Sequence, residues 1–479
     1  MFVAVDSHAQ LFISPGGNLG IAKDAIITLK NMDVENQGFI VHSGDMEVGG
    51  NIINSNSWIC DSAYISRIAL TLNWSNNLTF SSGIGRVEFN GSDQTIGGSI
   101  STNFYNLLLK GVSGNAKTML NNVSCLDSLY LTDVELATNG NTFLLKNASI
   151  PVQRISGYIS TFRNGVVKVI YPSALKGNTE LPLGYGLGIT KYKPIFLVNP
   201  ARDSFSFTLF GNSPTIDGRS ATNLQDSLCG INDNYYYNVL TFNSPLFYGI
   251  TKNNTEQYFT KLGRWNGKKW DKLSASGPTN SIPSQNLALN SQQASSTEYI
   301  SQAQERPFVN AGMDLTVLTN ESVQMNISGY FPKGSTYQWS QEAFFSCPTC
   351  PNPLFYMGSP GIYTIKVSNG FNCEAIDSII INRKGNYQAI IPNAFSPNGD
   401  MLNDEFGPFL FPGDKLDYLQ IFNRWGEKIY EGTEKWDGRY RGQLVMQGVY
   451  YYQLAIVGYS VGGVTNIKSH FSGDVTLFR

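Results

Sequence analysis

The chain has 479 residues, of which 15% are charged, and its 34 basic and 36 acidic side chains give a net charge of −2. This balance excludes the basic surface that a nucleic-acid partner requires, and no apolar run reaches the roughly 18 residues of a transmembrane helix. A chain of this length exceeds one hydrophobic core, so about three to four domains are expected.

Glycine and aromatic residues are abundant, with 47 Gly, 25 Tyr and 28 Phe. Short runs of Val, Ile, Leu, Tyr and Phe alternate with Asn, Ser, Thr and Gly, whereas amphipathic helical patterns are almost absent. This composition is typical of short strands joined by tight turns. We therefore predict an all-β protein.

Residues 1–9 resemble the end of a signal peptide. An apolar stretch from Phe2 to Val5 precedes the small residues Ser7 and Ala9, and cleavage is expected after Ala9. The basic segment and most of the apolar core that open such peptides do not precede it. A disordered N-terminus is the alternative interpretation.

Residues 10–185 contain short apolar runs, roughly 8–12 residues apart, with Asn-Gly, Ser-Gly and Gly-Gly turns between them. Examples are residues 25–29, 38–41, 68–72 and 106–109. Units this short cannot bury a hydrophobic face alone, but stacking them into a solenoid produces a continuous core. We predict a β-solenoid resembling a right-handed β-helix, with an ordinary β-sandwich as the alternative.

Residues 186–303 are predicted to form a β-sandwich. Residues 204–209 alternate with the period of a half-buried strand, and residues 264–270 (RWNGKKW) form a hairpin with an Asn-Gly turn. Trp265 and Trp270 of this hairpin either pack in the sandwich or stack on sugar rings, and packing is favoured. The polar tract from Asn290 to Gln304 is predicted to be a linker.

Residues 304–385 have the rhythm of an immunoglobulin-like module, with Trp339 on a central strand and an alternating strand at residues 361–367. The module contains Cys347, Cys350 and Cys373. Zinc would need two more ligands nearby, and a redox CxxC belongs at the start of a helix. A structural disulfide that leaves one cysteine over is therefore expected, and its pairing stays open.

Residues 386–479 carry the most specific signal. Its segments are, in order, residues 391–400 (IPNAFSPNGD), 403–406 (NDEF), 419–426 (LQIFNRWG), 436–438 (WDG), 448–452 (GVYYY) and 473–479 (GDVTLFR). They predict a compact sandwich of strands joined by turns. The last of these segments is itself a strand, which is either built into the sheet or presented to a partner at its edge.

These ordered motifs resemble the gliding-motility-associated C-terminal domain, the type B sorting signal of the type IX secretion system of Bacteroidota. The family usually has Gly where this chain has Met401, which alters one loop. The residues that the resemblance implies for sorting and partner binding are Pro397, Asn398, Gly399, Asp400, Asn403, Asp404, Phe422, Asn423, Arg424, Trp425, Gly426, Trp436, Asp437, Gly438, Gly448, Tyr450, Gly473 and Arg479.

The resemblance also implies partners and a location. The partners are the type IX outer-membrane translocon and an outer-membrane barrel protein of the family paired with type B domains. Export through the periplasm would end at the cell surface, attached to the outer membrane, or in the medium. The preceding module is similar to repeats of gliding-motility adhesins, on the basis of residues 347–353, 363–367 and 370–373.

The sequence offers little material for catalysis, and we expect no enzyme. It has three histidines, His8, His42 and His470, too few for a triad or a histidine-rich metal site. The acid pairs Asp45/Glu47 and Asp133/Glu135 each face one side of a strand, where two solvated acids are the commoner meaning.

A calcium ion is the alternative to a simple turn in the loop that holds Asn398, Asp400, Asn403 and Asp404, because calcium favours such clusters of oxygen ligands. No other cofactor is expected. Two functions remain. The first is an exported structural or adhesin-type surface protein with a C-terminal sorting domain, and the second is a polysaccharide-binding or polysaccharide-degrading protein with the same signal.

Overall fold

The computed structural model describes residues 9–186, 188–244, 246–251, 259, 261–273, 286–290, 297–318, 321–332, 334–356, 360–369, 373–384, 389–410, 414–458 and 468–479. The expected signal-peptide remnant therefore lies almost entirely outside the described residues. The chain divides into two compact units, Met1–Glu305 and Arg306–Arg479, each described by itself below.

The described residues form an all-β fold, as predicted. Helical structure among them is limited to short 3₁₀ helices, and none of these has the length or apolarity to span a membrane. Their bounds are η1 (Phe162–Asn164), η2 (Ile189–Lys191), η3 (Pro214–Asp217) and η6 (Glu342–Phe344).

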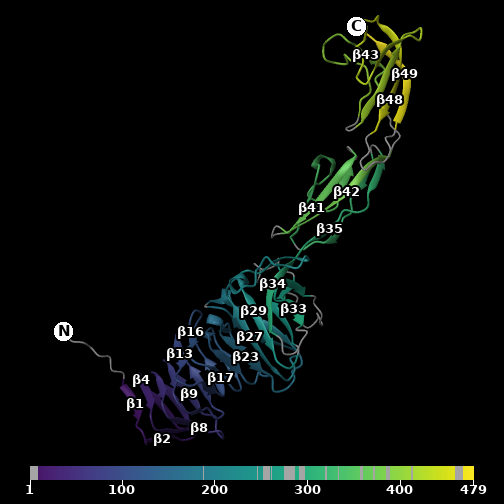
Figure 1. The fold of residues 1–479 in the computed structure, drawn as a ribbon. Helices are drawn as coiled ribbons and strands as arrows, with labels where there is room; N and C mark the ends of the chain where they lie inside the picture. Colours follow the sequence, from purple (N-terminus) through teal and green to yellow (C-terminus); the bar gives the residue numbers. More distant parts are fainter. Residues whose placement is uncertain are drawn as a thin grey trace, which may run out of the picture. The chain divides into compact units, whose positions relative to one another are not determined.

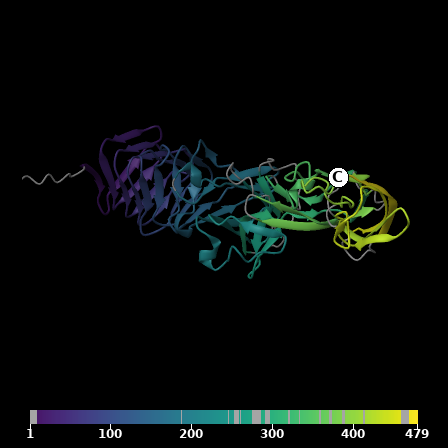
Figure 2. The ribbon, with the colours of Figure 1, turned by 90° about the horizontal axis from the view of Figure 1, so that it is seen from above.

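The first unit begins as a three-faced solenoid, which confirms the first prediction for this region (Figures 1 and 2). Equivalent strands of successive turns pair in parallel. The first face is β1 (Ala9–Ile13), β4 (Met32–Asn36), β7 (Ile52–Asn54), β10 (Trp74–Asn76), β13 (Gln94–Gly97), β16 (Ala116–Met119), β19 (Glu135–Ala137), β22 (Tyr158–Ser160) and β25 (Leu183–Gly184). The second face starts with β2 (Asn18–Ile21), β5 (Phe39–His42), β8 (Ser57–Cys60) and β11 (Phe80–Ser81). The third face is β3 (Ile26–Leu29), β6 (Asp45–Val48), β9 (Arg67–Leu70), β12 (Arg86–Phe89), β15 (Asn106–Leu109), β18 (Leu129–Leu131) and β21 (Gln153–Arg154).

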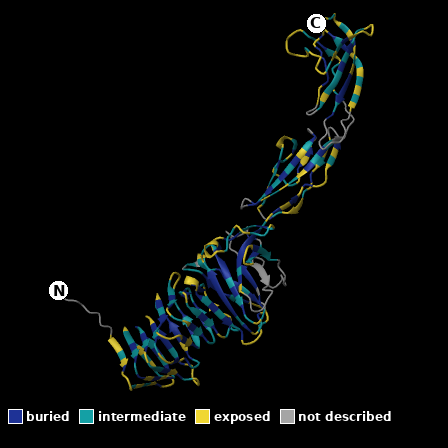
Figure 3. Ribbon diagram, viewed as in Figure 1, coloured by how far each residue is buried: buried dark blue, intermediate teal, exposed yellow. Residues whose placement is uncertain are grey.

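The interior of the solenoid is filled by alternate residues of each strand, and Figure 3 shows buried and more exposed positions alternating along them. Trp58, Trp74 and Phe104 are buried and stack from turn to turn, with ring centroids 6.2 Å apart for the first pair and 5.4 Å for the second. One turn alone could not cover rings of this size, so stacking of the turns supplies the core.

A ladder of buried asparagines marks one corner of the solenoid. The Asn36 amide donates to the Asn54 side-chain oxygen at 2.8 Å, and the Asn54 amide donates to the Asn76 oxygen at 2.8 Å. The second amide hydrogens bond the backbone oxygens of Ser57 and Thr79. Because buried amides are stable only when bonded, the ladder fixes the register of three successive turns.

After β11, the second face of the solenoid resumes as a separate sheet, which begins at β14 and runs into the predicted sandwich. Its strands are β14 (Thr102–Phe104), β17 (Val123–Cys125), β20 (Thr142–Leu145), β23 (Val166–Ile170), β27 (Ser204–Phe210), β29 (Tyr236–Thr241), β34 (Thr297–Glu305), β31 (Lys261–Trp265) and β32 (Trp270–Leu273), with β28 (Leu228–Ile231) also on β34. A facing sheet holds β24 (Asn178–Leu181), β26 (Ile195–Val198), β30 (Phe247–Thr251) and β33 (Asn286–Asn290). Pairing changes from parallel to antiparallel between β23 and β27, and one hydrophobic core spans both regions.

The predicted linker is wrong for its second half. Thr297–Glu305 forms β34, a central strand that pairs with β29 and β31. Its polar side chains are buried with partners: the Asn232 amide donates to Gln302 at 3.0 Å, and the Ser301 hydroxyl donates to the Asn232 backbone oxygen at 3.0 Å. Polar residues in a buried strand imitate the composition of a linker.

The second unit opens with a small β-module around Trp339, which is fully buried. Its main sheet has the order β36 (Leu315–Leu318), β42 (Glu374–Lys384), β41 (Gly361–Ser368) and β39 (Thr336–Trp339). Two ribbons pair β35 (Phe308–Asn310) with β38 (Ser328–Tyr330) and β37 (Ser322–Gln324) with β40 (Leu354–Tyr356).

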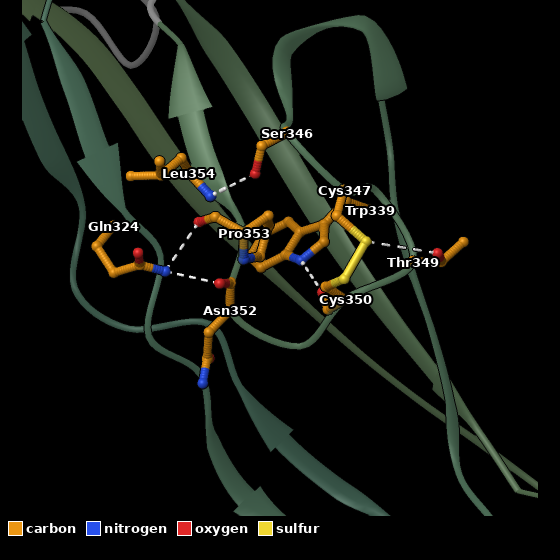
Figure 4. The surroundings of a disulfide bond; sticks show 9 residues. All are labelled: Gln324, Trp339, Ser346, Cys347, Thr349, Cys350, Asn352, Pro353 and Leu354. Carbon is orange, nitrogen blue, oxygen red and sulfur yellow. Dashed lines mark hydrogen bonds between the residues drawn. A yellow bond between two sulfur atoms is a disulfide. The ribbon is translucent and has the colours of Figure 1, made fainter.

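A disulfide joins Cys347 to Cys350 beside this tryptophan (Figure 4). The Trp339 indole N–H donates to the Cys350 backbone oxygen at 3.2 Å, and the Gln324 amide donates to the Asn352 backbone oxygen at 2.6 Å. The cysteine loop is therefore a structural cap on the module core. The structural disulfide expected among the three cysteines is confirmed, but the expectation that one cysteine is left over is wrong, because Cys373 is also disulfide-bonded.

The C-terminal domain is built on a sheet with the order β43 (Ala394–Phe395), β49 (Lys468–Leu477), β48 (Gly448–Val457), β44 (Lys415–Phe422) and β45 (Lys428–Gly432). A ribbon pairs β46 (Arg439–Tyr440) with β47 (Gln443–Leu444). The last strand, β49, is built into the sheet along β48 over its whole length, whereas β43 pairs on its other side only with Thr476 and Leu477. The domain has its own core, with Trp436 fully buried.

Candidate functional site

The motif residues of the C-terminal domain divide into a buried group and a surface group. In the buried group, Trp436 packs on Phe395 and Tyr450, with ring centroids 5.3 Å apart in each pair. The Trp436 indole donates to the Arg439 backbone oxygen at 2.9 Å, and the Tyr450 hydroxyl donates to the Met446 backbone oxygen at 2.6 Å. These residues hold the domain together and present no surface to a partner.

Gly438 belongs to the same group for two physical reasons. Its φ is +75°, a region that other residues rarely occupy, and a Cβ there would lie 2.9 Å from Cγ of Pro397 and 3.1 Å from Cδ1 of Leu477. The Arg479 guanidinium approaches the Gly438 backbone oxygen at 3.5 Å. Three of the separate sequence motifs, at residues 391–400, 436–438 and 473–479, thus meet at one tight packing point.

The surface group begins at the hairpin that joins β44 to β45. The Asn423 side-chain oxygen accepts the backbone N–H groups of Trp425 at 3.1 Å and Glu427 at 3.0 Å, and its amide donates to the Glu427 carboxylate at 2.9 Å. Asn423 therefore fixes the turn. The Trp425 side chain at its tip is 81% exposed, with the Arg424 guanidinium 5.3 Å from its ring centroid.

Strand register brings three distant motifs side by side on one face of the sheet. Phe422 of β44 pairs with Tyr451 of β48, and Tyr451 pairs with Asp474 of β49. The row forms part of a groove of about 600 Å³. Its lining is Phe422, Asn423, Arg424, Gly426, Tyr451, Tyr452, Gln453, Ser472, Gly473 and Asp474. We call these residues the C-terminal groove.

The C-terminal groove combines aromatic surface with opposite charges. Tyr451 is 53% exposed in the groove, although outward-facing aromatic residues on a strand are usually covered. Arg424 forms no ion pair with any of the described residues. The negative charge of the groove comes from Asp474 on β49, the strand beside Tyr451. An exposed aromatic patch with an available cation is the composition of a protein-binding surface.

The loop at residues 397–404 is held by its own side chains. The two Asp404 carboxylate oxygens accept the backbone N–H groups of Gly399 at 2.7 Å and Met401 at 2.8 Å. Asp400 accepts the N–H of Leu402 at 2.8 Å and the Asn398 amide at 2.9 Å, and its pKa is lowered by these bonds. The carboxylate oxygens of Asp400 and Asp404 thus accept hydrogen bonds within the loop, as the turn interpretation expects. Calcium binding stays a prediction.

Met401 lies at φ +67°, in the left-handed region that favours glycine. The family usually has glycine at this position, and glycine adopts this φ without strain. Met401 keeps the same turn at some cost in backbone energy. Its side chain is 91% exposed and makes no compensating burial.

The residues predicted for sorting and partner binding thus lie in three different places in the C-terminal domain. Residues 397–404 form a self-bonded loop, Trp436, Gly438 and Tyr450 lie in or beside the core, and Phe422, Asn423, Arg424, Gly426 and Gly473 line the groove. Sequence reasoning missed five of the lining residues, Tyr451, Tyr452, Gln453, Ser472 and Asp474. The sequence pattern that could have identified Tyr451 and Gln453 is the two-residue period of a strand, which places both on the face opposite Tyr450.

The structure shows the surroundings of His42 and of three acidic residues from the predicted pairs, Glu47, Asp133 and Glu135. His42 lies inside the solenoid, where burial lowers its pKa to about 4, and one ring nitrogen lies 2.9 Å from the Gly44 backbone oxygen. Glu47 accepts a hydrogen bond from Arg67 at 2.7 Å. Asp133 and Glu135 line a cavity of about 80 Å³, far below the roughly 300 Å³ and more of small-molecule sites.

Residues 389–470 match the family model described as the CHU_C type IX secretion signal domain. The resemblance drawn from the ordered motifs is confirmed at this level. The immunoglobulin-like character of the preceding module and the bacterial phylum stay predictions. No curated protein matches the chain.

Several solved structures align weakly. "PcdhgB3 EC1-4" has 8% identity over 64% of this chain and 72% of its own, with a TM-score of 0.19. Dimeric latent PorU from Porphyromonas gingivalis has 12% identity over 55% and 32%, with a TM-score of 0.14. The N-terminal four Ig domains of Dscam1 isoform 4.4 have 9% identity over 58% and 81%, with a TM-score of 0.18. Scores this low carry no argument for a common fold.

Proposed function

Because the chain carries a type IX secretion signal domain at residues 389–470, which directs export to the cell surface or the medium, we propose that it is a structural or adhesin-type surface protein. In this proposal the C-terminal domain addresses the chain to the type IX translocon. After export, the C-terminal domain binds an outer-membrane barrel protein, which holds the chain at the outer membrane.

The C-terminal groove is the surface that we assign to recognition. It gathers the segments around Phe422, Tyr451 and Gly473, which are far apart in sequence, into one patch that exists only in the folded domain. The single observation that carries the proposal is this convergence of the motifs at the groove, beside the exposed Trp425. A signal read this way depends on the fold of the domain rather than on a linear peptide.

The solenoid supports a structural role for the exported part. Its buried asparagine ladder and stacked aromatic rings tie each turn to the next. The burial of His42 and the small cavity at Asp133 and Glu135 support a structural role for these three residues. Such a stack provides long outer faces on which a partner surface can lie.

Deletion of residues 386–479 tests the sorting role in a bacterium that has a type IX system. We expect the truncated protein to accumulate in the periplasm, while the full chain is degraded by protease added to intact cells. The control is deletion of residues 306–385 alone, which keeps β34 intact and should leave surface display in place. Normal display of the chain lacking residues 386–479 would contradict the proposal.

A polysaccharide-binding passenger is the second candidate, with polysaccharide degradation as its enzymatic form. One observation favours the binding form. Of the two tryptophans in the hairpin of β31 and β32, Trp270 is fully buried, whereas Trp265 remains partly exposed and lines a pocket.

A further inference from the structure

A second pocket lies in the first unit, at the end of the sandwich where the β31–β32 hairpin meets β34 and the segment after η3. Its volume is about 580 Å³, within the usual range for small-molecule sites. The lining residues are Asp217, Gly218, Arg219, Arg264, Trp265, Asn266, Gly267, Thr297, Glu298 and Tyr299. We call this pocket the hairpin pocket.

An aromatic surface forms part of the hairpin pocket and is held in place from behind. The Trp265 ring packs edge-on against the fully buried Trp270, with centroids 5.7 Å apart. The two residues also pair across the hairpin, whose Asn266 side chain accepts the N–H groups of Lys268 and Lys269 at 2.9 Å each. Trp265 is therefore presented by a rigid turn, which lowers the entropy lost on binding.

The polar groups of the pocket are also positioned before any ligand arrives. The Arg219 guanidinium lies 3.4 Å from the Tyr299 ring centroid. It donates to the Asp217 backbone oxygen at 3.3 Å and forms no ion pair with any of the described residues. Arg264 donates to the Glu298 carboxylate at 3.4 Å.

The charges of the pocket cancel. Arg219 and Arg264 contribute two positive charges, and Asp217 and Glu298 contribute two negative charges, so the lining is neutral in sum. A strongly anionic or cationic ligand would meet an unfavourable charge on one side. A polyhydroxylated ligand meets both donors and acceptors, and hydroxyl groups can serve as either.

We propose that the hairpin pocket binds a neutral saccharide, with one face of a sugar ring lying on Trp265 and with hydroxyl groups bonded by Arg219 and Asp217. The C–H face of a pyranose is apolar and matches an aromatic ring, whereas its hydroxyls need charged or amide partners. This inference deepens the second candidate function and does not depend on the route of export.

Affinity electrophoresis of the purified full chain tests the proposal. The gels contain one soluble polysaccharide each: mixed-linkage β-glucan, xyloglucan, galactomannan or dextran as neutral probes, and alginate or polygalacturonate as acidic probes. We expect at least one neutral polysaccharide to retard the chain, with no retardation by the acidic ones. Retardation by none of the neutral probes, or by the acidic ones alone, would overturn the proposal.

Two variants locate the binding in the pocket. Trp265→Ala should weaken retardation at least about tenfold in apparent affinity, and Arg219→Met should weaken it while keeping most of the volume of the side chain. The matched control is Tyr356→Ala, which removes an exposed aromatic side chain from the other unit and should leave retardation unchanged. If both pocket variants bind like the parent while the chain is retarded, the saccharide binds elsewhere and the assignment is wrong.

Discussion

The same substitution at two motif tryptophans should differ greatly in its cost in unfolding free energy. Trp436 is fully buried, contacts Phe395 and Tyr450, and donates a hydrogen bond to the Arg439 backbone oxygen. Trp436→Ala should therefore cost about 3–5 kcal/mol of unfolding free energy, a large part of the total for a domain of this size. Trp425 is 81% exposed and contacts mainly Arg424, so Trp425→Ala should cost less than about 1 kcal/mol.

Urea unfolding of the full chain, followed by fluorescence and circular dichroism, measures the two costs. We expect the transition of the C-terminal domain to shift by roughly 2 M or more for Trp436→Ala and by under about 0.5 M for Trp425→Ala. Surface display should nevertheless fall for both variants, since one loses the fold and the other loses the contact surface. Normal display of Trp425→Ala would refute the role of this exposed ring in recognition, and a large loss of stability would refute the division into two groups.

Three further substitutions test other parts of the structure. Met401→Gly should stabilise the C-terminal domain by about 0.5–1 kcal/mol in urea unfolding, because the residue lies at φ +67°; a destabilised variant would contradict the strain. Asn54→Ala should cost roughly 2–5 kcal/mol in thermal unfolding, because it removes the buried bonds of Asn54 to Asn36, Asn76 and the Thr79 backbone oxygen, whereas Asn90→Ala, at an exposed position, should cost under about 0.5 kcal/mol. Burial raises the pKa of Glu88, but the hydrogen bond and charge of Arg67, with other nearby cations, lower it from 4.5 to about 2 in the fold. Because the folded pKa is the lower one, up to roughly 3 kcal/mol of stability is present above pH 4.5 and is lost as pH falls toward 2; Glu88→Gln should flatten this acid dependence in unfolding measured at stepwise pH.

The features that were predictable from sequence are local. Turn dipeptides between short apolar runs were enough to predict a solenoid, because each turn of the chain repeats the same local pattern. The CxxC and Trp339 of the small module were identified as structural, and the two lie in contact. The C-terminal domain was recognised because its motifs occur in a fixed order over residues 386–479.

The features that were missed depend on pairing between distant strands. Nothing near Tyr451 in sequence indicates that it lies beside Phe422 and Asp474, since the register of three strands decides this. The asparagine ladder is likewise invisible until the turns are stacked, with partners 18 and 22 residues apart. The expected linker failed because the buried Gln302 of β34 accepts a hydrogen bond from Asn232, 70 residues away along the chain.

A graft tests the central claim most directly. Residues 386–479, fused to a periplasmic reporter that has no export signal of its own beyond a signal peptide, should carry that reporter to the surface or the medium of a bacterium with a type IX system. The fraction of reporter accessible to added protease is the measured quantity, with the strain lacking the translocon as the reference. The account predicts that accessibility depends on both the graft and the translocon, and a reporter that stays in the periplasm would contradict it.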